Sequence, residues 1–162
     1  MSEGLAIQEG DALIVVDVVN NLLLGDSAIP AADEVIPPLK RIIEIFHPRG
    51  LPIYATETEG AECASALGLP AFTMMISRAP APANISGFSG TKLEFQLMMY
   101  GVKRLLIGGL GDGVAATASD AIKRGHQVVV LRDAVRVHPA DEQALSDLAA
   151  LGTVFVSAAE VA

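Results

Sequence analysis

The chain has 162 residues, of which 51% are hydrophobic, and a formal net charge of −8 at pH 7. This length suits one domain with a buried core, so we expect a single domain over residues 1–162. The acidic balance argues against nucleic acid as a partner, because phosphate groups would be repelled. The single cysteine, Cys63, excludes an internal disulfide, which fits a reducing compartment and predicts a cytoplasmic protein.

Apolar runs in this sequence are too short for a membrane span. Residues 12–16, 105–110 and 128–131 have the length of strands, well below the roughly 18 residues of a membrane helix, and the first residues lack the basic start of a signal peptide. We therefore expect no membrane partner. The apolar excess indicates a buried sheet and leaves enough apolar surface to predict a homo-oligomer.

The first half of the chain predicts strands separated by a helix. Residues 11–17 are an apolar run closed by Asp17, which is typical of a strand buried on both faces of a parallel sheet. Residues 33–46 have apolar side chains at helical spacing, and 51–55 indicate a second strand. We expect residues 56–70 to be mainly loop and residues 71–76 to form a short strand.

Strands and helices alternate regularly in the second half. Helices are predicted at 93–100, 114–124 and 141–150, and strands at 104–109, 127–131 and 153–157. This alternation implies right-handed crossovers and an α/β fold with three layers, α/β/α, around a central, mainly parallel sheet. In such sheets, ligands bind at the carboxyl ends of the strands.

Two features at the ends of predicted strands are candidates for chemistry. Asp17 would be partly desolvated, which raises the pKa of a carboxyl and suits a general acid or base, although it could equally cap N–H groups or pair with a cation. The glycine turn at 109–113 precedes a helix and offers N–H donors for an oxyanion, or is simply a tight packing turn. Val114 stands where a G-x-G-x-x-G fingerprint needs glycine, which disfavours a nucleotide-binding module.

The other polar residues give weaker signals. Asp133 is predicted to organise the loop after its strand. His47, His126 and His138 lie far apart in sequence without a helix-spaced pair, so we expect no metal and no cofactor. No base is placed beside Cys63 by its spacing, and we assign the thiol no catalytic role.

A succession of motifs resembles the isochorismatase-like hydrolases. They are V-V-D-V-V-N at 15–20, S-G-F-S-G-T at 86–91, G-V-K-R-L-L-I-G-G-L at 101–110 and A-T-A-S-D-A at 116–121, in the family's order over nearly the whole chain. The resemblance implies a Rossmann-like α/β/α fold and hydrolysis of a small molecule. Most members use an aspartate, a lysine and a cysteine whose thiolate attacks an amide or nitrile carbon. Isochorismatases proper lack the cysteine and split a vinyl ether with the aspartate as acid.

Only the aspartate of that triad is retained, at Asp17. The cysteine position falls on Gly113 when counted back from residues 116–118, and on Ala115 when counted forward from residue 109. Two family spacings put the lysine position at Arg78 or at Pro82. The family's metal-binding D-x-H reads E-T-E at 57–59, which argues against a metal.

Two functions follow from the resemblance. The first is a hydrolase without a cysteine nucleophile, in which Asp17 is the general acid or base and Arg78 holds an anionic group of a carboxylate-bearing small molecule. The second is an inactive family member that persists as a binding or oligomer-forming protein. The residues expected in the site are Asp17, Arg78 and Gly113 for catalysis and Asn20, Gly111, Asp112 and Ala115 for substrate binding.

Overall fold

The computed structural model describes residues 4–79 and 85–162, which are built around a six-stranded sheet. The strand order is β3-β2-β1-β4-β5-β6, and every neighbouring pair is parallel. The strands are β1 (Asp11–Val16), β2 (Ile53–Thr58), β3 (Met74–Arg78), β4 (Arg104–Leu110), β5 (Gln127–Arg136) and β6 (Val154–Val156). The α-helices are α1 (Asn20–Leu23), α2 (Ile36–Phe46), α3 (Leu93–Met99), α4 (Gly113–Lys123) and α5 (Glu142–Asp147).

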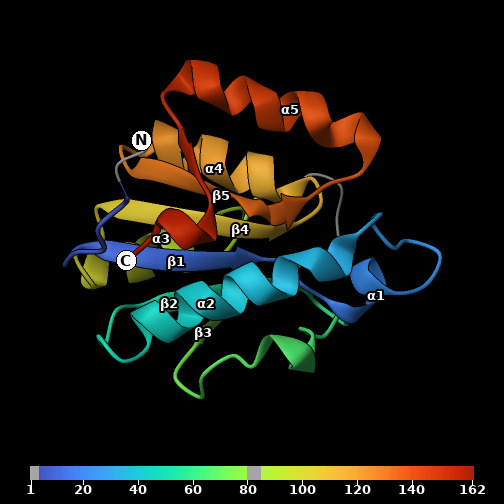
Figure 1. Cartoon of the computed structure of the whole chain (residues 1–162), viewed down its shortest axis with the longest axis horizontal. Coiled ribbons are helices and arrows are strands. Elements are labelled where there is room, and N and C mark those ends of the chain that lie inside the picture. Colours follow the sequence, from blue (N-terminus) through green and yellow to red (C-terminus); the bar gives the residue numbers. More distant parts are fainter. Residues whose placement is uncertain (1–3, 80–84) are drawn as a thin grey trace.

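Helices cover both faces of the sheet. On one face, Leu39 and Phe46 of α2 pack with Leu13 of β1 in one apolar core. On the other, Leu97 of α3 and Val114 of α4 pack with the opposite side of the same strand. Figure 1 shows α2 running beside β1, with α4 and α5 farther along the sheet. The predicted fold class, three-layer α/β/α with a parallel sheet, is confirmed.

Burial on both faces explains why β1 reads as an unbroken apolar run. Leu13 and Val15 belong to the core on the α2 face, whereas Ala12, Ile14 and Val16 belong to the core on the α3 and α4 face. A strand with successive side chains on opposite faces must be apolar throughout when both faces are covered. No helix within the described residues is long and apolar enough to cross a membrane.

Three strands extend two residues or more beyond their predicted carboxyl ends. The predicted start of the loop at residue 56 was wrong, because β2 continues to Thr58. This residue pairs with Arg78 of β3. β3 begins three residues later than expected and ends at Arg78. β5 passes through an irregularity opposite Gly108 and continues to Arg136. These extensions, together with the unpredicted α1, shape the carboxyl edge of the sheet, where ligands bind in folds of this class.

The strand order places a crevice at the carboxyl end of β1. The chain leaves β1 to build β2 on one side and later adds β4 on the other, which makes this the point where the topology reverses. β4 passes very close to β1 there, since a side-chain Cβ at Gly109 would lie 2.0 Å from the Val16 carbonyl oxygen. Glycine at 109 therefore brings the turn after β4 against the residue that follows β1.

Candidate active site

Asp17 follows β1 directly and has a strained backbone. Its φ is 52°, in the left-handed region that residues other than glycine seldom occupy. Its N–H donates to the Thr56 carbonyl at 3.1 Å, and its carbonyl accepts from the Val19 N–H at 2.8 Å. The residue is only 7% exposed. Strain at a buried acid is a feature of functional sites, because the surrounding structure must hold the residue in place.

The Asp17 carboxylate forms a buried, two-point ion pair with Arg78. Arg78 Nη1 donates to Oδ1 at 3.0 Å and Nη2 to Oδ2 at 2.6 Å, while Thr56 Oγ1 also donates to Oδ1 at 2.9 Å. Asp17 is therefore paired with a cation, which was one of the alternatives that the sequence left open. Each terminal nitrogen of Arg78 donates to Asp17, and Nη2 also donates to Thr58 Oγ1 at 3.3 Å, so of the terminal N–H groups only the second one of Nη1 has no partner among the described residues and is left for a substrate anion.

Burial sets the protonation behaviour of Asp17. Desolvation raises the pKa of its carboxyl, and the nearby Asp112 carboxylate raises it further. Hydrogen bonding and charge from Arg78 and a hydrogen bond from Thr56 act in the opposite direction without cancelling the effect of burial. The carboxyl thus accepts a proton more readily than an exposed aspartate, as its place at the end of a buried strand predicts.

The first residue of α4 lies against this carboxylate. A Cβ at Gly113 would lie 2.9 Å from Asp17 Oδ2 and 2.8 Å from the Ile85 carbonyl oxygen, so only glycine fits without a shift. Within the described part of the chain, the N–H groups of Asp112 and Gly113 have no hydrogen-bond acceptor. Since the positive end of the α4 dipole is also here, the helix start offers donors for a negatively charged oxygen.

A cavity of about 410 Å³ opens beside the ion pair. Its walls include Asp17, Arg78 and Asp112, all expected in the site, and Asn21 and Glu59, which were not. The structure thus brings Asp17, the arginine of β3 and Asp112, which precedes α4, to one pocket, whereas Gly113 contacts Asp17 without lining the pocket. A molecule the size of a small amide would fit in this space.

Other predicted residues lie elsewhere. Asn20 is exposed and does not line the pocket, because the chain turns into α1 after Val19 and presents Asn21 instead. Gly111 is buried in the turn and Ala115 packs in the core beneath α4, so neither lines the pocket. Pro82 lies outside the described residues.

Sequence reasoning missed Thr56, which donates to Asp17. Thr56 is the register partner of Val16, so its side chain sits one strand away from the acid. Its position could have indicated this role, because Thr56 is a polar residue directly after the apolar run of the second strand. Polar residues ending neighbouring parallel strands meet at the same edge of the sheet.

Cys63 is close to the site but is a poor nucleophile. It is half-buried and forms an isolated bridge with Val19. Burial, aided by the carboxylates of Glu57 and Asp17, raises the pKa of its thiol to about 12. A thiol with this pKa is protonated at neutral pH, and Cys63 does not line the pocket.

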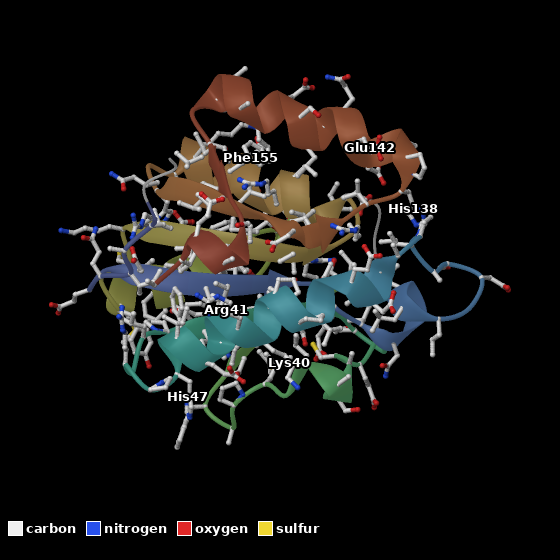
Figure 2. All side chains as sticks on the ribbon, viewed as in Figure 1. Lys40, Arg41, His47, His138, Glu142 and Phe155 are labelled. Atoms are coloured by element: carbon white, nitrogen blue, oxygen red, sulfur yellow. The ribbon has the colours of Figure 1, made fainter. Side chains whose placement is uncertain are left out.

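The remaining predicted polar groups do not join the site. Asp133 does not organise a loop after its strand, because β5 continues past it, and its carboxylate instead accepts the Ala158 N–H at 2.9 Å. His138, labelled in Figure 2 near Glu142 at the start of α5, does not line the pocket.

In comparisons with known proteins, residues 11–160 match the isochorismatase domain model. The chain is 31% identical over 139 residues to a streptothricin hydrolase from Streptomyces noursei, covering 80% of this chain and 55% of that protein. It thus spans about half the length of this relative.

Solved structures extend the comparison. A pyrazinamidase of Pyrococcus horikoshii, determined in complex with zinc, matches with a TM-score of 0.83 and 34% identity, covering 91% of this chain and 99% of that one. An N-carbamoylsarcosine amidase from Thermoplasma acidophilum matches with a TM-score of 0.81 and 25% identity, covering 91% and 96%.

The zinc of the Pyrococcus structure has no matching ligand set here. Across residues 4–79 and 85–162, no three histidine, cysteine or acidic side chains come together as a metal site requires. Glu57 is the last residue but one of β2, and Glu59 follows the strand, in place of a histidine-containing motif. These residues do not fit a zinc ion, and no step of the chemistry below involves one.

Proposed function

This chain belongs to the isochorismatase family, and we propose that it hydrolyses small molecules without a cysteine nucleophile, using Asp17 as general acid and base. The observation that carries the proposal is the state of Asp17, a strained and buried carboxyl with a raised pKa at a substrate-sized pocket. A general acid or base works best when its pKa is moved toward neutrality, which burial does here.

Water would be the nucleophile in this proposal, since residue 113 has no side chain. In amide hydrolysis, Asp17 takes a proton from water as the water oxygen bonds to the carbonyl carbon. It then returns the proton to the leaving nitrogen as the carbon–nitrogen bond breaks. The Asp112 N–H, at the pocket wall, and the Gly113 N–H beside it are the donors we assign to the carbonyl oxygen as it gains charge.

Arg78 acts on the ionised form of Asp17 in this scheme. Its two-point contact stabilises the ionised carboxylate and fixes its orientation toward α4. An enol ether would instead need the protonated form of Asp17, which the raised pKa makes more accessible. The relatives named above suggest amides as the first substrates to test, and family resemblance adds nitriles and vinyl ethers.

A second candidate function is ligand binding without catalysis. Three hydrogen bonds from Arg78 and Thr56 fill most of the acceptor positions of the Asp17 carboxylate. If the pair never opens, the carboxylate cannot take a proton from water. The pocket would then hold a ligand that is not turned over.

The test compares the natural chain with Asp17→Asn and a matched control, Asp11→Asn, which removes the other buried carboxylate paired to an arginine. The substrates are pyrazinamide, N-carbamoylsarcosine, streptothricin, simple nitriles and vinyl ethers. We expect Asp17→Asn to lower kcat/KM by about a hundredfold or more, the usual effect of losing a general acid or base. Asp11→Asn should change it by about twofold at most in the folded protein.

Both variants lose a charge from a buried pair, so circular dichroism must first show that each is folded. Equal rates for the natural chain and Asp17→Asn would remove Asp17 from the mechanism. Saturable binding without turnover of any substrate would support the second candidate. Cys63→Ser should leave kcat/KM unchanged, because the thiol neither lines the pocket nor ionises at neutral pH.

A further inference from the structure

The charges that line the Asp17 pocket do not balance. Its four charged side chains are Asp17, Arg78, Glu59 and Asp112. Asp17 and Arg78 neutralise each other through their two-point contact. Among the described residues, Glu59 and Asp112 form no salt bridge, which leaves two uncompensated carboxylates at the pocket.

These two carboxylates follow the strands on either side of β1. Glu59 follows β2, where its N–H donates to the Arg78 carbonyl at 2.9 Å, and Asp112 precedes α4 after β4. Because β2 and β4 are the two neighbours of β1, Glu59 and Asp112 approach Asp17 from opposite sides. Asp112 is near enough for its charge to raise the pKa of Asp17.

Apolar side chains complete the pocket. Leu22 of α1 and Ile85 both line it, so part of a ligand would be buried against hydrocarbon. A carboxylate on the ligand would meet Glu59 and Asp112, and Arg78, the one cation among the described lining residues, already has its charge neutralised by Asp17. This reverses the expectation of a carboxylate-bearing molecule that Arg78 suggested in the sequence.

We infer that the pocket selects substrates that carry an amine or guanidinium cation beside the bond to be hydrolysed, with Glu59 and Asp112 as the residues that determine this preference. The inference rests on the proposed function, because it takes this pocket as the substrate site. Both carboxylates are exposed, so their attraction is screened by salt, and the preference should weaken as ionic strength rises.

The test uses three short primary amides of different charge: 3-aminopropanamide (cation), butanamide (neutral) and succinamate (anion). We expect kcat/KM to fall in that order. Glu59→Gln should reduce the ratio of kcat/KM for the cation over butanamide by about fivefold, and adding Asp112→Asn should reduce it by about fivefold again, as expected for exposed charges. Glu44→Gln, on the outer side of α2, is the control and should leave the ratio unchanged.

Binding measured independently of turnover separates this inference from the proposed function. Binding of each amide is followed by NMR chemical-shift changes in the full chain, at low and high salt. Preferential binding of 3-aminopropanamide that Glu59→Gln weakens, without hydrolysis, would support the inference and count against the proposed function. Hydrolysis or binding without charge preference, or with a preference that survives in the double variant, would overturn the inference.

Discussion

β1 carries an aspartate paired with an arginine at each of its ends. Asp11 accepts from Arg104 Nε at 2.8 Å and Nη2 at 2.6 Å, and Asp17 accepts from Arg78 at 3.0 and 2.6 Å. Both carboxylates are buried, and each lines a cavity, with the one at Asp11 being the larger at about 510 Å³. Neither a buried ion pair nor the volume of a cavity therefore distinguishes the proposed active site.

Backbone strain and the surroundings of the pair distinguish the two ends. Asp11 has ordinary strand geometry, and its partner Arg104 is its register neighbour on β4. Gln8 N–H also donates to Asp11, and Arg104 donates to the Ala6 carbonyl, so this pair ties the N-terminal segment to the sheet. Asp17 instead has a positive φ and is reached by Arg78 from two strands away.

The Asp17 pair is also the one at the carboxyl edge of the sheet, beside the start of a helix. Arg78 Nε is buried without a hydrogen-bond partner in the part of the chain that the structure describes, and this pair therefore has a buried donor that is not satisfied there. A pair held under strain, with a buried donor left unbonded, is suited to change during a reaction, whereas a pair tied to the neighbouring backbone suits a structural role.

The largest expected effect comes from removing each arginine. Arg104→Met leaves the Asp11 carboxylate buried and unpaired, which should lower the free energy of unfolding by about 3–5 kcal/mol. Arg78→Met should cost less, because Asp17, with its raised pKa, can take up a proton and become neutral. Urea unfolding at pH 7 measures both changes.

The variant that loses more stability should lose less activity. The folded fraction of Arg104→Met should keep its kcat/KM, and Arg78→Met should lose most of it. Arg78→Lys tests whether charge alone suffices, since lysine cannot make the two-point contact. Full activity in Arg78→Met would mean that the two pairs are equivalent and that the strain at Asp17 has no functional meaning.

Replacing the glycines that lie beside the two aspartates should have a smaller effect on the free energy of unfolding. A Cβ at Gly113 would press on Asp17 Oδ2 and on a backbone oxygen, so Gly113→Ala should destabilise the protein by about 1–3 kcal/mol, although alanine favours helices. Gly10, beside Asp11, has a φ of 96° and nothing nearer than 3.8 Å to an added Cβ. Gly10→Ala should therefore cost about 1 kcal/mol through backbone strain alone.

Only Gly113→Ala should change the chemistry, because its methyl group displaces the carboxylate. Unfolding free energies and kcat/KM of the two variants are the measurements. A stabilised Gly113→Ala with unchanged activity would show that the start of α4 does not bear on Asp17.

Local sequence pattern explains the sheet better than it explains the site. β1 was predictable because burial on both faces requires the unbroken run at 12–16. The E-T-E segment at 57–59 is polar and was read as loop, since its pairing with β3 depends on a strand some 20 residues away. Family motifs identified Asp17 and Arg78 separately, but their contact spans 61 positions and needs the fold to be seen.

The smallest expected effect concerns a third carboxylate, Glu160. It shows how an arginine partner affects the pKa of a carboxyl that is not deeply buried. It also accepts from an arginine, Arg132 at 2.6 Å, but this pair is exposed to solvent. The Ser157 backbone N–H, Arg132 and the Ser157 hydroxyl lower the pKa of Glu160 to about 2, from 4.5. The same kind of partner thus accompanies a lowered pKa at the surface and a raised one at buried Asp17.

The two acids should therefore shift stability with pH in opposite directions. A lowered folded-state pKa means that Glu160 stabilises the fold above about pH 4.5 and that this contribution is lost as the pH falls toward about 2. The stability difference between the natural chain and Glu160→Gln should shrink over that window.

For Asp17, the folded state binds its proton more readily than the unfolded state. Its contribution to stability should therefore become more favourable as the pH falls through its raised pKa toward 3.8. Unfolding curves of the natural chain, Glu160→Gln and Asp17→Asn across this range measure both slopes. Slopes of the same sign would mean that Asp17 behaves as an ordinary paired acid, and the contrast between the two ends of β1 would then lose its electrostatic basis.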